Sequence, residues 1–192
     1  MFIQTEETPN PAALKFLPGR PVLETGVADF TSREAAARSP LARLLFEIDG
    51  VAGVFLGSDF VTVTKTNEKN WQVLKPMVLG AIMDHFTANV PVMEAGEDAA
   101  SGLEGDDQEF NDDDVDGEII EQIKELIETR VRPAVAQDGG DIVYKGFKNG
   151  TVYLNLRGSC AGCPSSSATL KMGIENMLKH YVPEVLQVEA VM

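Results

Sequence analysis

Cysteine and histidine are scarce in this chain of 192 residues, which has two of each. So few cysteines exclude the disulfide framework of a small secreted domain. They also cannot complete a four-cysteine zinc or iron–sulfur site within one chain, and the histidines have no ligand-like spacing to them. Cys160 and Cys163 therefore either carry out thiol–disulfide chemistry alone or share a metal centre with a second copy of the chain.

Long apolar runs and basic stripes are also missing. No stretch of about 18 apolar residues occurs, so we expect no membrane span. Lys and Arg do not gather into a stripe, which disfavours nucleic acid as a partner. Residues 1–7 have neither the basic start and apolar stretch of a secretory signal nor the Arg-rich character of a transit peptide. We expect a cytoplasmic protein of a bacterium, or a mitochondrial matrix protein if a presequence was removed.

The net charge of −14 is concentrated in one short segment. Residues 94–116 carry 11 of the 30 acidic residues and no Lys or Arg. Low hydrophobicity and charge of one sign predict a disordered, flexible linker. The flanking segments are nearly neutral, and hydrophobic residues make up 44% of the chain, enough for a core. We therefore predict two domains, 1–93 and 117–192, joined by the acidic linker.

The first predicted domain mixes strands and helices. Ser39-Pro40 predicts a helix start, with the serine as N-cap and the proline at the first helical position. Gly57-Ser58-Asp59 predicts a hairpin turn. A second helix is expected over 71–88, where Pro76 marks either a kink or the true first turn. Strands are expected at 2–5, 14–17, 51–56 and 60–65. This domain shows no catalytic constellation, and we interpret His85 on its second helix as a packing residue.

The second predicted domain has the order α-β-β-α-β. Apolar residues at helical spacing predict a helix over 119–131, with Pro133 as a kink or an ending turn. Asn149-Gly150 is a strong hairpin signal. Another helix begins near Pro164 and ends before Pro183. Strands are expected at 142–147, 151–156 and 185–191. The predicted fold class is α+β, with two small two-layer domains.

The cysteines lie between a strand and a helix. Gly158 and Gly162 allow the backbone to turn tightly and to approach a bound group. Pro164 suits the first helical position, and the N–H groups after it would point toward the sulfurs. We expect this helix start to lower the pKa of the thiols and to favour an anionic cluster.

Four interpretations of the pair remain open on these residues. A thioredoxin-like dithiol oxidoreductase fits locally, but the 29 residues after Cys163 are too few for that fold. A structural zinc could be held by four cysteines from two chains. Two incidental thiols are the plainest interpretation. The fourth is an iron–sulfur cluster that bridges two subunits.

Motifs in both halves of the chain resemble a known family. The second half of the chain resembles the C-terminal domain of NifU-type proteins in the motifs Asp138-Gly139-Gly140-Asp141, Gly158-Ser159-Cys160-Ala161-Gly162-Cys163-Pro164 and Thr169-Leu170-Lys171. The first half resembles the N-terminal domain of Nfu-type cluster carriers in the motifs Thr8-Pro9-Asn10-Pro11, Ser39-Pro40-Leu41-Ala42 and Asp59-Phe60-Val61-Thr62. The resemblance covers nearly the whole chain except the acidic segment.

This resemblance implies a cluster carrier and not an enzyme. Cys160 and Cys163, each from two subunits, would hold a [4Fe–4S] cluster, with [2Fe–2S] as the alternative, and binding would produce a homodimer. An upstream scaffold would donate the cluster. Apo iron–sulfur proteins of the aconitase and lipoate-synthase types would accept it.

Three polar residues near the pair receive plainer interpretations. Asp138 and Asp141 flank a Gly-Gly turn, which is ordinary loop chemistry, and a role near the cluster is the lesser alternative. Lys171 is interpreted as a solvated helix lysine.

The first domain, which lacks ligands, is expected to recognise partners or to orient the site.

Overall fold

The computed structural model describes residues 2–94, 117–161 and 164–191, without the side chains of 164–166. Two compact units are present, one within 1–105 and the other within 106–192. Each unit has a hydrophobic core of its own. The predicted α+β fold class is confirmed. Of the predicted linker only Glu94, which pairs with Arg43 at 2.9 Å, lies within the described residues.

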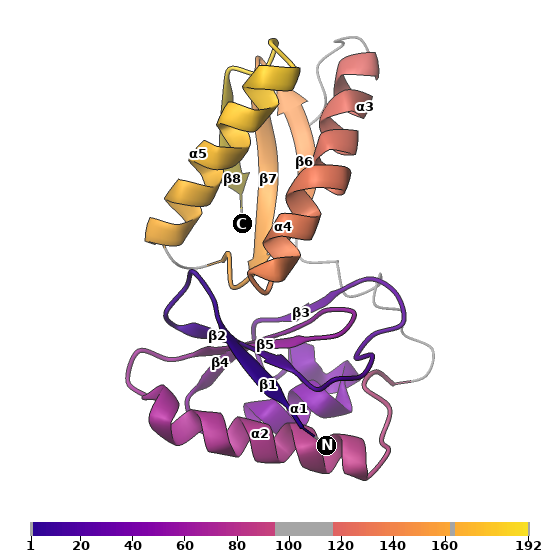
Figure 1. Cartoon of the computed structure of the whole chain (residues 1–192), viewed down its shortest axis with the longest axis vertical. Helices are drawn as coiled ribbons and strands as arrows, with labels where there is room; N and C mark the ends of the chain where they lie inside the picture. Colours follow the sequence, from indigo (N-terminus) through magenta and orange to yellow (C-terminus); the bar gives the residue numbers. More distant parts are fainter. Residues whose placement is uncertain (1, 95–116, 162–163, 192) are drawn as a thin grey trace. The chain divides into compact units, whose positions relative to one another are not determined.

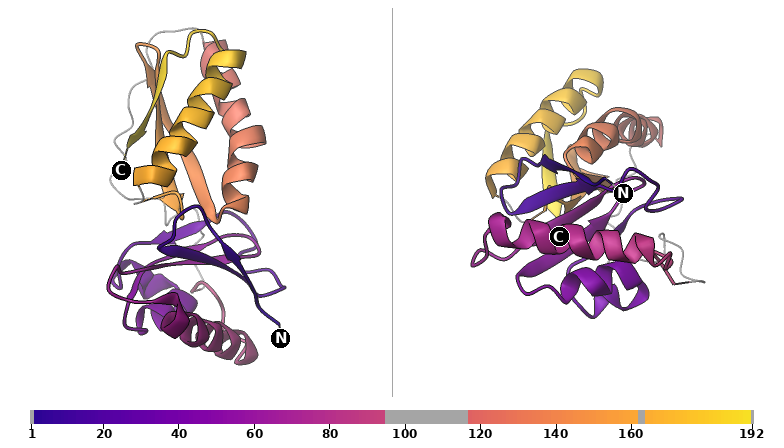
Figure 2. Two further views of the ribbon diagram at one scale, coloured as in Figure 1. Left: turned by 60° about the vertical axis from the view of Figure 1, so that its left-hand side comes forward. Right: turned by 60° about the horizontal axis from the view of Figure 1, so that its bottom comes forward.

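The first unit is a five-stranded antiparallel sheet with two α-helices over one face (Figures 1 and 2). The strand order is β1-β2-β5-β4-β3. The strands are β1 (Gln4–Glu7), β2 (Ala13–Leu17), β3 (Ala28–Phe30), β4 (Val51–Leu56) and β5 (Val61–Lys65). The helices are the 3₁₀-helix η1 (Ala35–Arg38), α1 (Pro40–Phe46) and α2 (Trp71–Thr87). Phe16 and Phe30 from the sheet and Leu45 and Ile82 from the helices are fully buried in the shared core.

The helix starts and the hairpin of the first unit were predicted correctly, with one error at Pro76. Ser39 caps α1, since its Oγ accepts a hydrogen bond from Ala42 N at 3.1 Å. β4 and β5 form the predicted hairpin. The first-turn alternative for Pro76 is wrong, because α2 runs through Pro76 and begins at Trp71. Asn70 caps α2 by accepting a hydrogen bond from Gln72 N at 3.0 Å.

The second unit is a three-stranded sheet with helices over one face (Figure 1). In the order β6-β7-β8, the first pair is antiparallel and the second is parallel. The elements are α3 (Gly117–Leu126), the π-helical turn η3 (Ile127–Val131), α4 (Arg132–Gln137), β6 (Gly140–Lys148), β7 (Thr151–Gly158), α5 (Pro164–Tyr181) and β8 (Gln187–Val191). The predicted order α-β-β-α-β is confirmed, although its first helix is divided into three pieces.

The turn between β6 and β7 is the predicted Asn-Gly hairpin. Asn149 and Gly150 both have positive φ, at 49° and 77°, as a type I′ turn requires. The carbonyl of Gly150 also accepts hydrogen bonds from the N–H groups of Leu186 and Gln187, at 2.7 and 3.2 Å. The turn therefore also anchors the chain where it enters β8.

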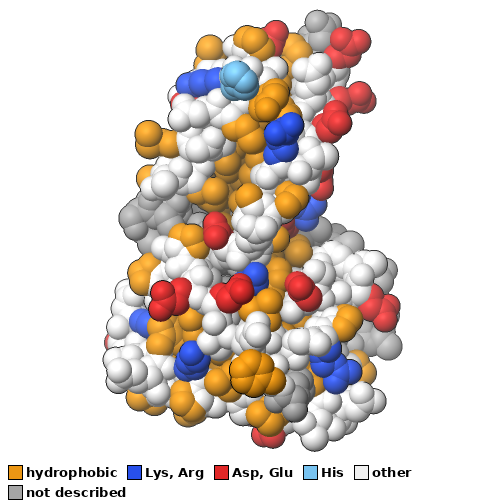
Figure 3. All heavy atoms as spheres, in the orientation of Figure 1, with side chains coloured by type: hydrophobic (Ala, Val, Ile, Leu, Met, Phe, Trp, Pro, Cys, Tyr) orange, Lys and Arg blue, Asp and Glu red, His pale blue; other side chains and the backbone are white. Residues whose placement is uncertain are grey.

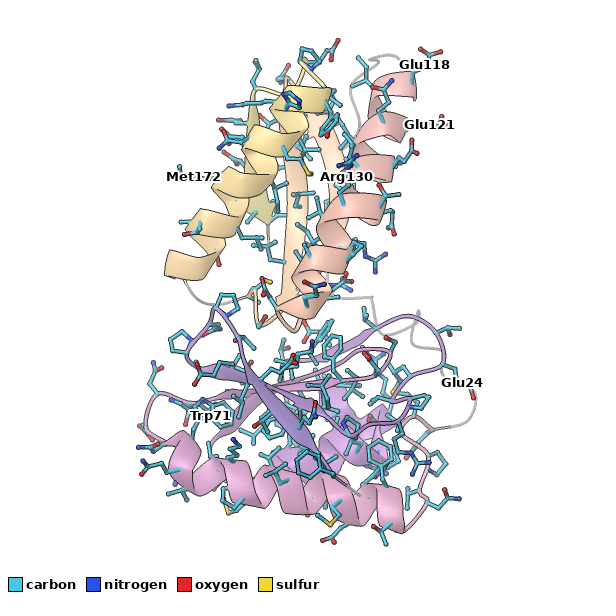
Figure 4. The ribbon with its side chains drawn as sticks, in the orientation of Figure 1. Glu24, Trp71, Glu118, Glu121, Arg130 and Met172 are labelled. Carbon is cyan, nitrogen blue, oxygen red and sulfur yellow. The ribbon has the colours of Figure 1, made fainter. Side chains whose placement is uncertain are left out.

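Charged side chains are distributed unevenly over the second unit. Acidic side chains lie along the outer side of α3 (Figure 3), and Figure 4 labels Glu118 and Glu121 among them. Arg130 of η3, also labelled there, lies over the Tyr181 ring of α5, with 5.0 Å to the ring centroid. In the ranges that the structure describes, no helix is long and apolar enough to cross a membrane.

Candidate metal centre

Cys160 lies in a tight turn just beyond the end of β7. Gly158, the last residue of that strand, has a φ of 64°, a conformation that glycine adopts readily. The Cys160 side chain is only 6% exposed and belongs to the hydrophobic core of the second unit. Cys163 and Gly162 lie outside the described residues. The arrangement of the two thiols therefore remains a prediction.

The cysteine turn is fastened to the turn that precedes β6. The hydroxyl of Ser159 donates a hydrogen bond to the carbonyl of Asp138, and Ser159 N donates to the carbonyl of Gly139 at 3.3 Å. On the other side, the Ser167 hydroxyl of α5 donates to the Cys160 carbonyl at 3.0 Å. Hydrogen bonds from two neighbouring elements thus hold the backbone around Cys160.

Gly140 makes room for the Cys160 sulfur. A Cβ at position 140 would lie 2.7 Å from Cys160 Sγ and 2.7 Å from the carbonyl oxygen of Arg157. Both distances are shorter than such contacts allow, and the carbonyl belongs to the paired strand β7. Only glycine therefore fits at position 140 without displacing the cysteine turn.

Asp141 takes part in a buried ion pair, so its interpretation as an ordinary turn residue is wrong. It lies in β6, is 4% exposed, and accepts two hydrogen bonds from Arg132, at 2.8 and 3.0 Å. Arg132 also donates to both carboxylate oxygens of Glu128, at 2.9 and 3.0 Å. These carboxylates raise the pKa of Arg132 above its usual value, with Asp141 as the main cause. Asp138, by contrast, ends α4 as an ordinary C-cap residue.

The pKa of the Cys160 thiol is raised to about 11, mainly because the side chain is buried. The negative charges of Asp138 and Asp141 add to the rise, and a hydrogen bond with Ser159 opposes it. The expected lowering by the helix start is therefore wrong for Cys160, whose sulfur is buried against Gly140. A protonated, buried thiol is a poor nucleophile in this position. Metal binding at Cys160 must displace a proton.

The other predicted candidates bring no further ligand to the site. His85 lies in the first unit, where it is 4% exposed and its ring packs edge-on against Phe86 at 5.4 Å. Its interpretation as a packing residue agrees with this position. Lys171 is half-buried on α5. Among the residues that the structure describes, no three His, Cys, Asp or Glu side chains gather as a metal site.

The fold and the site together define a class of protein. A small α+β domain carries a Cys-x-x-Cys loop between a strand and a helix, and one chain supplies two cysteines where a closed metal site needs four ligands. On its own, such a domain offers half of a four-ligand metal site.

Comparisons with known proteins identify the family. Residues 3–89 match "Scaffold protein Nfu/NifU N terminal", and residues 123–189 match "NifU-like domain". The human "NFU1 iron-sulfur cluster scaffold homolog, mitochondrial" is 54% identical over 193 residues, which cover 100% of this chain and 72% of the human protein. The chain therefore belongs to the Nfu/NifU-like family, and the resemblance noted in the sequence is confirmed.

A second curated relative agrees with this assignment. "NifU-like protein 4, mitochondrial" from Arabidopsis thaliana is 52% identical over 191 residues, covering 98% of this chain and 65% of that protein. The solution NMR structure of a NifU-like protein from Saccharomyces cerevisiae has a TM-score of 0.44 and 26% identity, and covers 50% of this chain and 86% of that one. The chain spans about two thirds of the length of these curated relatives. Their names describe no catalytic activity.

Proposed function

We propose that this chain is an iron–sulfur cluster carrier. Two copies hold one [4Fe–4S] cluster through Cys160 and Cys163 of each, and the cluster is then transferred to apo-proteins. The observation that carries the proposal is that both cysteines of the chain lie in one strand-to-helix loop, in a family whose relatives are named iron–sulfur cluster scaffolds. Thiolate sulfur is the ligand that such clusters take.

The cluster is cargo, and the incomplete site suits its release. Each chain contributes two thiolates, so neither chain encloses the cluster alone. Cys160 gives up its proton when it binds iron and regains one when it lets go. Cysteines of an acceptor can replace the thiolates one at a time, and loss of the cluster removes the link between the two chains. An upstream scaffold supplies the cluster, and apo-proteins of the aconitase and lipoate-synthase types receive it.

The proposal includes a location and a division of labour. Relatives named as mitochondrial support the mitochondrial matrix, whereas nothing supports the bacterial cytoplasm. Residues 117–192 form the cluster-binding domain, residues 1–93 recognise partners or orient the site, and the acidic segment 94–116 joins them. Separate hydrophobic cores in the two units support this division.

Anaerobic reconstitution of the full chain with iron and sulfide tests the proposal. We expect about four irons and four sulfides per dimer, broad visible absorption, and a mass that doubles with cluster loading. Cys160→Ser and Cys163→Ser should each abolish both the cluster and the dimer. Gly173→Ala is a matched control in the same unit, because a Cβ there meets nothing within 4 Å.

Other outcomes would identify the competing interpretations. Zinc in place of iron, at one ion per dimer, would mean a zinc-bridged dimerisation module. A colourless monomer that reduces disulfides would mean a dithiol oxidoreductase. About two irons and two sulfides per dimer would replace [4Fe–4S] with [2Fe–2S] and leave the carrier function intact.

A further inference from the structure

The Cys160 sulfur of the single chain is buried against Gly140, in a position that we call the sulfur seat. It is defined by Asp138 and Gly139 before β6, by Gly140 at the start of β6 and by Ser159 beside the cysteine. The missing side chain of Gly140 provides the space, since a Cβ there would lie 2.7 Å from Sγ. Ser159 closes the seat with hydrogen bonds to the carbonyls of Asp138 and Gly139.

A sulfur in this position cannot also bind iron that a second chain helps to hold. A shared cluster has to lie at a surface that both chains reach, whereas the Cys160 side chain is 6% exposed and packs within the core of its own unit. The thiol thus has two incompatible tasks, one inside the domain and one at its surface. The contacts of Gly140 and Ser159 belong to the inside position.

We propose that Gly140 and Ser159 are positioning residues that hold the Cys160 sulfur in an inward resting position in the cluster-free chain, and that the sulfur leaves the sulfur seat when a cluster is loaded. This inference rests on the proposed function. It assigns a task to the Asp-Gly-Gly turn, which supplies the space for the sulfur and the carbonyls that retain the cysteine turn. Ser159 acts through its hydrogen bonds to the carbonyls of Asp138 and Gly139 and through its contact with the Cys160 sulfur at 3.9 Å.

The energetic basis is an exchange of local contacts for bonds between sulfur and iron. Leaving the sulfur seat breaks the Ser159 hydroxyl bond to Asp138, and leaves that carbonyl in need of another partner. The outward position gains the bonds between sulfur and iron, which far exceed this loss. When the cluster departs, the inward contacts form again, so the resting position assists release.

The test measures how often the sulfur leaves the sulfur seat, using iodoacetamide on the cluster-free full chain. Cys163→Ser is introduced so that Cys160 is the single thiol. Alkylation of a buried thiol takes place in the open state, so the rate in buffer divided by the rate in guanidinium reports the open population. We expect alkylation in buffer to be about a hundredfold slower than in guanidinium.

Two substitutions should weaken the sulfur seat. Ser159→Ala removes the hydroxyl bond and adds no volume, so alkylation should accelerate about tenfold. Gly140→Ala places a Cβ where the sulfur lies and should accelerate alkylation further. Gly173→Ala, with open space around it, should leave the rate within about twofold of the parent. Far-UV circular dichroism establishes that each variant is folded, and Ser159→Ala alone decides the test if Gly140→Ala does not fold.

Loading is then measured in the chain with both cysteines. If the sulfur must leave the sulfur seat, Ser159→Ala should speed the appearance of cluster absorbance by a factor similar to its effect on alkylation. A folded Ser159→Ala that is alkylated at the parent rate would overturn the resting position. Faster alkylation with unchanged loading would overturn the link to loading. The alkylation arm needs no cluster, so a parent chain that bound no iron would refute the carrier function separately.

Discussion

Two buried ionisable side chains have opposite surroundings. Asp141 is matched by two hydrogen bonds from Arg132, so its charge is compensated. His85 is as deeply buried, yet its Nε2 has no hydrogen-bond partner among the described residues. A charge is tolerated at the first position and is costly at the second. Acid should therefore weaken the first unit through His85.

The first prediction concerns pH and the stability of the first unit. Burial lowers the pKa of His85 below its usual 6.5, so the folded unit favours neutral imidazole. This contribution to stability is fully present above pH 6.5 and is lost as the pH falls below it, through the lowered pKa of the folded state. Fluorescence of Trp71, the single tryptophan, should report a urea midpoint that falls between about pH 7 and about pH 5.

Substitution identifies the group responsible. His85→Phe keeps an aromatic ring in the core and removes the titration, so the Trp71 midpoint should change much less with pH. His180→Phe is the matched control, because His180 is exposed on α5 of the other unit. A pH dependence of unchanged steepness in His85→Phe would show that another group causes it.

The sequence predicted which residues form the candidate site better than it predicted what surrounds them. Cys160 and Gly140 both belong to motifs visible in the sequence, but spacing does not tell which way a sulfur points. The contact between them depends on how β6 pairs with β7. Arg132 could not be singled out, because it meets Asp141 only through the packing of α4 beside β6. The error in the Cys160 pKa has the same origin, since burial was not visible.

At the scale of elements, short sequence motifs predicted a helix start and a hairpin turn. Ser39-Pro40 located the start of α1, and Asn149-Gly150 located the turn between β6 and β7. Such signals are local, so sequence alone reveals them. β3 has three residues, too few for a periodic pattern. The strand orders and the π-helical turn η3 also went unpredicted, because long-range packing decides them.

The second prediction concerns the cap of α1. The Ser39 hydroxyl is fully buried, accepts a hydrogen bond from Ala42 N and donates one to the carbonyl of Val92 at 2.7 Å. Ser39→Ala removes both and should lower the free energy of unfolding of the first unit by about 2 kcal/mol. Urea unfolding followed by Trp71 fluorescence measures the loss.

An exposed serine of the same unit provides the comparison. Ser58 lies in the turn between β4 and β5, and its hydroxyl makes an exposed hydrogen bond with Asp59 at 3.4 Å. Ser58→Ala should change the unfolding free energy by less than about 0.5 kcal/mol. Equal losses in the two variants would contradict a specific role for the Ser39 cap.

At the scale of the whole molecule, the chain contains two separate hydrophobic cores. One is formed by residues of the first unit, and the other by residues of α3 to β8. Both proposed cluster ligands belong to the second unit. Folding and cluster binding should therefore both be properties of residues 117–192.

The third prediction follows from this division. Residues 117–192 alone should melt cooperatively by circular dichroism and load the same iron per dimer as the full chain. Residues 1–93 alone should fold, with the Trp71 fluorescence of the folded full chain, and should bind no iron. Cluster transfer from residues 117–192 to acceptor proteins should be slower than transfer from the full chain if the first unit recognises those acceptors. An unfolded 117–192 would contradict the independence of the second core.

Burial of the Cys160 thiol also bears on its oxidation. Oxidation to sulfenic and then sulfinic acid proceeds through exposed thiolates, and its later steps are irreversible. Cys160 is neither exposed nor deprotonated in the single chain, because its pKa is raised to about 11. In the single chain, this sulfur is consequently shielded from peroxide.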